Sequence, residues 1–159
     1  LAAISLIRDQ VKGANVGVGT VCNASEFDAA VDAGASFVVS PGQSDALFER
    51  AQVTNIPFLP GAVTATEVMA AKEAGFKVLK FFPASTSGGA AAIKAFAGPF
   101  ADLQFVPTGG INLDNAGSYL SLSNVRAVGG SWLTPADAIQ NGQWADITQI
   151  AREASQLGA

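Results

Sequence analysis

The chain has 159 residues, of which 49% are hydrophobic and 14% charged, and its formal net charge is −4 at pH 7. This length and composition predict one globular domain with a substantial core and exclude a disordered or coiled-coil protein. The acidic balance and the lack of a basic run argue against nucleic acid or an anionic membrane surface as a partner, and no apolar stretch approaches the ~20 residues of a membrane span.

Strand-like runs alternate with helical patterns along the chain. The first pattern is an amphipathic helix over 1–11, where Leu1, Ile4, Ile7 and Val11 recur at helical spacing. The alternation that follows is typical of a repeating βα unit with parallel strands. Strands are expected at 16–20, 37–40, 57–59, 78–82, 104–107 and 127–129, and further helices at 25–33, 45–53, 64–74, 89–97, 114–120, 135–140 and 144–157.

Four of the expected strands end at a proline beside a small residue. Proline cannot donate to a strand ladder, so it ends the strand and turns the chain outward. Because parallel strands that end alike bring their carboxyl ends to one face, and because that face carries the active site of a βα-barrel, we expect functional residues there. The four motifs are Ser40-Pro41-Gly42, Leu59-Pro60-Gly61, Phe82-Pro83-Ala84 and Val106-Pro107-Thr108-Gly109.

One lysine interrupts an apolar run. In a strand Val78, Lys80 and Phe82 share one face, and Leu79 and Phe81 share the other, so both faces are apolar. A parallel strand covered on both faces would place the Lys80 amine in a dry interior, where burial lowers its pKa from about 10.4 and leaves a nucleophile able to form a Schiff base with a ketone. An exposed edge strand with a snorkelling lysine explains the same residues equally well.

The single cysteine and the absence of histidine restrict the chemistry further. Cys22 cannot form an intrachain disulfide, which fits a reducing, cytoplasmic setting, and we expect it to be inert. Without histidine there is no serine–histidine or cysteine–histidine triad and no histidine-ligated zinc. Acid–base chemistry must therefore use carboxylates, lysine, tyrosine, hydroxyls or water.

Two glycine-rich turns follow the last two expected strands, at 108–110 and 129–131. Glycine lets backbone N–H groups approach an anion, a following helix start adds a favourable dipole, and in a βα-barrel these turns are the usual phosphate cradle. Part of the second segment has a structural explanation, because Thr134, Pro135 and Asp137 form a good helix-entry signal.

Three further residues have competing explanations. The Thr20 hydroxyl, at a strand end, could bind a carboxylate or carbonyl oxygen, since Asn23 is better placed than Thr20 to cap the next helix. Trp132 and Trp144 are interpreted as core or helix-packing residues.

Together these motifs resemble the 2-keto-3-deoxy-6-phosphogluconate (KDPG) and 4-hydroxy-2-oxoglutarate (KHG) aldolases, which are class I aldolases on a (β/α)8 barrel. The resemblance implies an α/β fold of the TIM-barrel family, with one domain over 1–159 and about six βα units. It runs through Val18-Gly19-Thr20-Val21, Ala33-Gly34-Ala35, Ser40-Pro41-Gly42, Ile56-Pro57 to Pro60-Gly61, Lys80-Phe81-Phe82-Pro83-Ala84, Ala97-Gly98-Pro99-Phe100, Pro107-Thr108-Gly109-Gly110-Ile111 and Gly129-Gly130-Ser131-Trp132-Leu133.

The resemblance identifies Lys80 as the counterpart of the Schiff-base lysine. It implies reversible cleavage of KDPG to pyruvate and glyceraldehyde 3-phosphate without a metal or organic cofactor, in a homo-oligomer that the family's trimers suggest. It also implies that Thr20 and Pro41 border the pyruvyl part of the substrate, that Phe82 packs beside it and that Thr108 affects the stereochemistry of the new carbon centre. The residues expected to hold the phosphate are Gly109, Gly110 and Ser131.

The chain also departs from the family pattern. The family's first two βα units, which carry a general acid–base glutamate and a carboxylate-binding arginine, have no counterpart here, and capping or dipole effects explain Glu26, Glu67 and Asp114. We therefore expect an N-terminally truncated barrel with impaired activity, whose open edges near Val16 and Ala127 are covered by a longer polypeptide or another chain. The alternative is a noncatalytic phosphate-binding or assembly module; an isomerase on a similar barrel fits the lysine motif less well.

Overall fold

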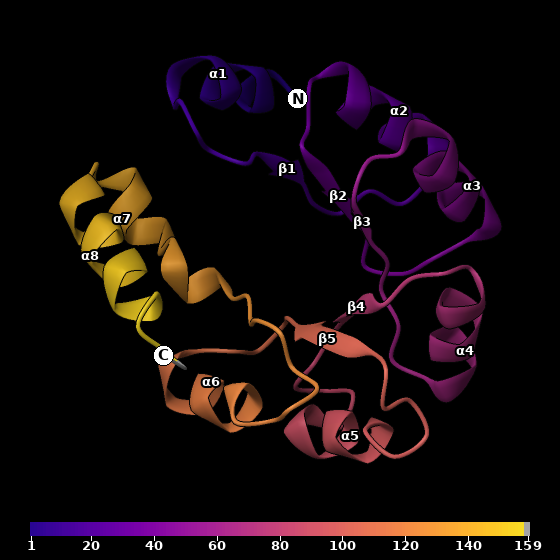
Figure 1. The fold of residues 1–159 in the computed structure, drawn as a ribbon. Coiled ribbons are helices and arrows are strands. Elements are labelled where there is room, and N and C mark those ends of the chain that lie inside the picture. Colours follow the sequence, from indigo (N-terminus) through magenta and orange to yellow (C-terminus); the bar gives the residue numbers. More distant parts are fainter. Residues whose placement is uncertain (158–159) are drawn as a thin grey trace. The chain divides into compact units, whose positions relative to one another are not determined.

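The structure is a computed structural model in which residues 1–157 are described. Helices and strands alternate along the chain up to residue 120, and both strand pairs of the three-stranded sheet are parallel, as the βα repeat predicts (Figure 1). The chain divides into two compact units, unit 1 (Leu1–Lys80) and unit 2 (Phe81–Ala159).

Unit 1 contains a three-stranded parallel sheet in the order β1-β2-β3. The ladder pairs Gly17 with Phe37 and Val38 with Phe58, and a further parallel bridge joins Gly61, after β3, to Lys80 in β4. The helices α2 and α3 pack against each other beside these strands (Figure 1). The bounds are α1 (Ala2–Gln10), β1 (Gly17–Val18), α2 (Ala24–Asp32), β2 (Phe37–Val39), α3 (Asp45–Thr54), β3 (Phe58–Leu59), α4 (Ala65–Glu73) and β4 (Val78–Phe81).

Phenylalanine rings form much of the unit 1 core. Phe58 on β3 contacts Phe27 of α2 and Phe76 with ring centroids 5.6 Å apart in both pairs, and Phe48 of α3 lies 5.1 Å from Phe76. The edge-to-face arrangement of the Phe58 pairs is the one that aromatic quadrupoles favour. These contacts attach α2 and α3 to the sheet, which fixes the positions of the loops at its ends.

Unit 2 has a second aromatic core. Phe105 on β5 packs with Phe81 and Phe96, and Phe96 also contacts Phe100. The buried Asn124 amide donates to the Ile93 carbonyl over 2.8 Å, so this polar group is satisfied inside the core. The remaining elements are α5 (Gly89–Phe96), β5 (Gln104–Pro107), α6 (Leu113–Leu120), the 3₁₀ helix η1 (Ser131–Leu133), α7 (Ala136–Gln140) and α8 (Trp144–Ala154).

Three sequence-based expectations for the C-terminal part were wrong. Residues 127–129 form no strand, because the segment is short and runs into Gly129, which offers no side chain to pack, so only isolated bridges join Val125 to Phe105 and Gly129 to Thr108. Trp144 is not a packing residue: its side chain is 62% exposed, on the helix α8, none of whose residues is buried. That helix ends at Ala154 rather than at residue 157.

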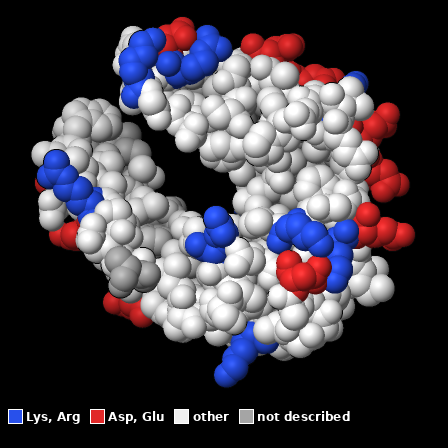
Figure 2. Space-filling model, in the orientation of Figure 1, with Lys and Arg blue, Asp and Glu red and all other residues white. Residues whose placement is uncertain are grey.

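Surface features agree with the composition. Among residues 1–157, no helix combines the length and apolar character that a membrane span requires. On the face drawn in Figure 2, lysine and arginine side chains occur in separate small groups, several of them beside acidic side chains, and form no continuous basic surface.

A capping box begins α4. The Thr64 hydroxyl accepts from the Glu67 N–H over 3.3 Å, while the Glu67 carboxylate accepts from the Val63 and Thr64 N–H groups over 2.9 and 2.8 Å. Burial raises the pKa of the Glu67 carboxyl, but these N–H groups and the Thr64 hydroxyl lower it, and the net pKa lies below the ordinary value. The carboxylate therefore stabilises the fold, as its position at a helix start predicts.

We predict that Glu67→Ala lowers the free energy of unfolding by about 1 kcal/mol at pH 7. Because the folded-state pKa is lowered, this contribution is complete above the unfolded value of about 4.3 and is lost as the pH falls through the folded-state pKa. Urea denaturation between pH 7 and 3 measures it. Glu67→Gln should flatten this part of the acid dependence, whereas Glu73→Gln, at the other end of α4, should retain it; equal curves for the two variants would contradict the assignment.

Candidate active site

The carboxyl ends of the unit 1 strands bring three predicted site residues to one edge. Thr20 follows β1, Pro41 follows β2, and Lys80 pairs with Gly61 just beyond β3. Because these strands run parallel, their carboxyl ends lie at the same edge of the sheet. Thr20, Pro41 and Lys80 therefore lie at the same edge of the unit 1 strands.

Both backbone groups of Lys80 are hydrogen-bonded. Its N–H donates to the Pro60 carbonyl over 2.8 Å, and its carbonyl accepts from the Ala62 N–H over 2.9 Å. The side chain is half-buried, and burial lowers the pKa of its amine below the ordinary lysine value. The amine is thus a better nucleophile at neutral pH than that of an exposed lysine.

The burial of Lys80 lies between the two sequence-based alternatives. Leu79 and Phe81 are completely buried, whereas Val78 and Lys80 are half-buried and Phe82 is 36% exposed. The prediction of a dry interior on both faces of this strand is therefore wrong for the lysine face. Partial exposure leaves the amine accessible to a small substrate.

The loops after β2 and β3 are in close contact. The Gly61 N–H donates to the Gly42 carbonyl over 2.9 Å, and a side chain at Gly61 would collide with the Pro41 carbonyl. Only glycine allows this approach. The contact fixes Pro41 against the segment that pairs with Lys80.

Gln43 supports the same loops, and no local sequence pattern indicates this role. Its amide Nε2 donates to the Glu67 carbonyl over 2.8 Å, a contact across 24 residues. Its Oε1 is buried and has no hydrogen-bond partner in the described part of the chain. The loop after β2 is therefore tied to the first turn of α4.

Thr20 has an unusual backbone conformation. Its φ is 63°, in the left-handed region that costs a residue with a β-branched side chain of order 1–3 kcal/mol. The capping role belongs instead to Asn23, whose side chain accepts from the Glu26 N–H, as predicted. Thr20 itself is exposed at the carboxyl edge, with its carbonyl accepting from the Cys22 thiol over 3.4 Å.

The acidic side chains at helix starts have structural partners. The Glu26 carboxylate accepts from the Cys22 N–H over 2.7 Å, and Glu67 completes the capping box of α4. Asp114 lies in the first turn of α6, where it complements the helix dipole. These positions confirm the structural explanation, and none of the three is assigned as a general base.

Phe82, Thr108 and Gly109 lie together in unit 2. The Thr108 carbonyl accepts from the Ala84 N–H over 2.8 Å, and a side-chain carbon at Gly109 would lie 3.1 Å from the Phe82 ring. The Thr108 hydroxyl oxygen is buried and has no hydrogen-bond partner among the described residues. Sequence patterns could not reveal this unsatisfied group.

The two glycine-rich turns of unit 2 are adjacent. Gly129 forms a parallel β-bridge with Thr108, and its N–H donates to the Pro107 carbonyl over 3.1 Å. A side-chain carbon at Gly130 would lie only 2.7 Å from the Ile111 carbonyl oxygen. Ser131 follows directly, exposed at the start of η1. The structure therefore brings the predicted phosphate-binding segments together.

Backbone N–H groups without a hydrogen-bond partner in the described part of the chain lie at the first glycine-rich turn of unit 2 rather than at the start of the helix α6. At the start of α6 the Asn112 side chain already accepts from the Asp114 and Asn115 N–H groups over 3.0 and 3.2 Å. In contrast, the N–H groups of Gly110 and Ile111 make no hydrogen bond within the described residues. Consecutive free N–H groups in a turn are typical of anion-binding concavities.

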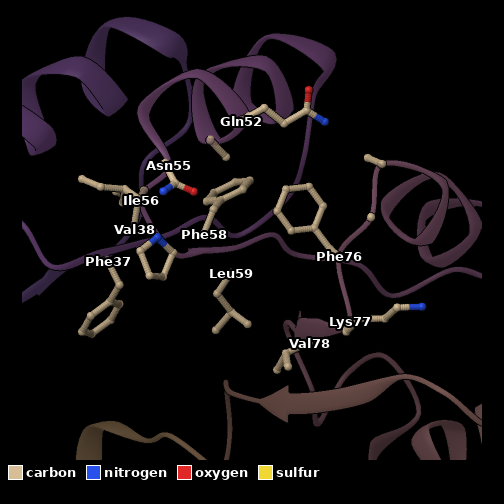
Figure 3. Close-up of a pocket in the computed structure, with 14 residues that line it drawn as sticks. Phe37, Val38, Gln52, Asn55, Ile56, Phe58, Leu59, Phe76, Lys77 and Val78 are labelled. Atoms are coloured by element: carbon tan, nitrogen blue, oxygen red, sulfur yellow. The ribbon is translucent and has the colours of Figure 1, made fainter.

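An apolar pocket of about 640 Å³ lies at the other end of the unit 1 strands. It surrounds the amino ends of β2, β3 and β4, with Phe58 and Phe76 on one side and Leu59 and Val78 on another (Figure 3). No predicted site residue lines it. Elsewhere in residues 1–157, no three histidine, cysteine, aspartate or glutamate side chains gather where they could hold a metal ion.

Comparison with known proteins gives consistent results. The family model for KDPG and KHG aldolase matches residues 1–150. The chain is 45% identical over 154 residues to the 2-dehydro-3-deoxy-phosphogluconate aldolase of Pseudomonas aeruginosa. The aligned residues cover 97% of this chain and 70% of that relative. It is 45% identical over 152 residues to the KHG/KDPG aldolase of Escherichia coli, covering 96% and 71%.

A solved structure agrees with these sequence matches. The KDPG aldolase of Legionella pneumophila, with pyruvate captured at low pH as a covalent carbinolamine, aligns with a TM-score of 0.94 at 40% identity and covers 96% of this chain and 74% of that one. The α/β fold with parallel strands is therefore TIM-barrel-like. With its lysine at the carboxyl edge of such strands, the chain belongs to the KDPG and KHG aldolase family.

Proposed function

We propose that this chain is a class I aldolase that reversibly cleaves KDPG to pyruvate and glyceraldehyde 3-phosphate through a Schiff base on Lys80. The observation that carries the proposal is a half-buried lysine with a lowered pKa at the carboxyl edge of parallel strands. The captured carbinolamine of the Legionella relative is the kind of intermediate that such an amine forms.

The reaction follows from the chemistry of a neutral amine. The Lys80 Nζ attacks the C2 carbonyl carbon, and loss of water from the carbinolamine gives a protonated imine. When the C4 hydroxyl loses its proton, the C3–C4 bond breaks and its electron pair moves into the imine, which releases glyceraldehyde 3-phosphate and leaves an enamine. Protonation at C3 and hydrolysis then release pyruvate and restore the amine.

The roles of the other site residues are assigned separately within each unit. In unit 1 we assign Thr20 and Pro41 to the pyruvyl part of the substrate, because both end strands at the edge that holds Lys80. In unit 2 we assign Phe82 to packing against the substrate and the free Thr108 hydroxyl to the new carbon centre. The phosphate ligands are Gly109, Gly110 and Ser131, with the Ile111 N–H as a further donor. The free N–H groups of Gly110 and Ile111, and the bridge that joins Gly129 of the second glycine-rich turn to Thr108 of the first, support this assignment.

Several broader features belong to the same proposal. We assign residues 1–159 to a single (β/α)-barrel domain with about six βα units that needs no organic cofactor or metal. Its family suggests a homotrimer. A noncatalytic phosphate-binding module would not require a nucleophilic lysine, so it is the outcome that the next experiment must exclude.

We predict that Lys80→Ala lowers the rate of pyruvate release from KDPG by about 10³-fold or more, because it removes the amine proposed to form the imine with the substrate. A lactate dehydrogenase-coupled assay measures the rate. The matched control is Lys94→Ala, which removes an exposed lysine from α5 and should retain most of the activity. If the wild type releases no pyruvate while inorganic phosphate still binds, the chain is a binding module and the proposal fails.

We also predict that the Lys80 amine reacts at lower pH than an ordinary lysine. Burial disfavours the ammonium form, so the neutral amine appears as the pH rises through a value below about 10.4. Competitive acetylation by trace acetic anhydride, followed by peptide mass spectrometry with Nα-acetyl-lysine as internal standard, gives the titration midpoint. A midpoint at or above that of the standard would contradict the effect of burial.

A further inference from the structure

Asn115 joins the start of α6 to the first glycine-rich turn of unit 2. Its Oδ1 accepts from the Asn112 N–H over 2.9 Å, and its Nδ2 donates to the Gly110 carbonyl over 2.9 Å. The first bond belongs to the capping box of the helix. The second is not needed to begin the helix, and its effect is on the turn.

The bond to Gly110 fixes the direction of a backbone donor. A trans peptide is planar, so its N–H points opposite to its carbonyl. Since the Gly110 carbonyl faces Asn115, the Ile111 N–H points away from α6. In the same way, the Ser85 N–H holds the Gly109 carbonyl over 3.1 Å, so the Gly110 N–H points away from Ser85.

Without this bond the turn could reorient. Gly110 has a φ of 76°, and glycine readily adopts other conformations. Rotation of the peptide between Gly110 and Ile111 would replace a donor in the turn with a carbonyl oxygen, which repels an anion. The Ser85 side chain lies so close to Gly110 that a side-chain carbon at residue 110 would collide with it. Ser85 therefore restricts the turn on this side.

We infer that Asn115 is a positioning residue for the phosphate group of the substrate. It acts through the Gly110 carbonyl, which it keeps turned away so that the Ile111 N–H remains available to the phosphate oxygens. This role rests on the proposed phosphate site at the glycine-rich turns. It extends that site to a side chain that need not touch the substrate.

The test compares Asn115→Asp with Asn112→Asp. Each variant adds one negative charge at the start of α6, and each keeps an oxygen that can accept the capping hydrogen bonds. Only Asn115→Asp removes the donor to the Gly110 carbonyl. A third variant, Asn115→Ala, removes the same donor without adding charge and keeps the Asn112 cap, so the test stands if the aspartate variant does not fold.

The readouts are kcat/KM for KDPG and for its unphosphorylated analogue 2-keto-3-deoxygluconate, together with the affinity for inorganic phosphate by isothermal titration calorimetry. We expect Asn115→Asp and Asn115→Ala to lower kcat/KM for KDPG by about 10- to 100-fold and to weaken phosphate binding similarly, because each donor to a charged group contributes that much. The values for the unphosphorylated analogue should change by less than about 3-fold, and Asn112→Asp should retain most of the preference for KDPG.

Two results would overturn the inference. One is an equal loss for both substrates, which means that Asn115 supports the fold alone; the other is the same preference for KDPG in the Asn115 and Asn112 variants. A wild type that binds no phosphate and does not prefer KDPG would instead refute the phosphate site itself.

Discussion

Two backbone hydrogen bonds determine what the lysine of this protein can do. The Lys80 N–H and carbonyl are both bonded to the segment that follows β3, and the neighbouring Leu79 side chain is completely buried. These contacts hold the strand in register, so Lys80 lies beside Gly61, just beyond the carboxyl end of β3. The close approach of Gly61 to Pro41 and the bond from Gln43 to α4 hold the adjoining loops against that strand.

The Lys80 side chain is neither completely buried nor completely exposed, and this partial burial affects both its pKa and its accessibility. A completely buried amine would be nucleophilic but unreachable, and a completely exposed one would remain protonated at neutral pH. Half-burial lowers the pKa of Lys80 and keeps the amine open to a small ketone. The carboxylates of Glu26 and Glu67 accept backbone N–H groups at helix starts, so neither is assigned as the base that removes the C4 hydroxyl proton.

Local signals in the sequence predicted most of the elements. Helix caps such as Asn23, proline-ended strands and glycine pairs depend on neighbouring residues, and the structure reproduces the helices and all but one of the expected strands within a few residues. The segment 127–129 failed because β propensity alone does not form a strand when Gly129 supplies no packing. Trp144 failed because apolar character does not specify which surface covers a side chain.

The candidate site was only partly predictable. Lys80, Thr108 and the glycine-rich turns could be found because each ends or interrupts a strand pattern. Gln43 could not be found, because its bond to the Glu67 carbonyl spans 24 residues. Asn115 gave a usable signal, since Asn112 and Asn115 have the spacing of a capping box, but its bond to Gly110 depends on the shape of the turn.

The most direct test of the central claim is to incubate the protein with pyruvate and sodium borohydride, and then to measure its intact mass and map the modified peptide. Borohydride reduces the imine to a stable amine, so the modified residue identifies the nucleophile. The account predicts one reduced pyruvyl adduct per chain, on Lys80. A folded protein that forms no adduct, or forms it on another lysine, would contradict it.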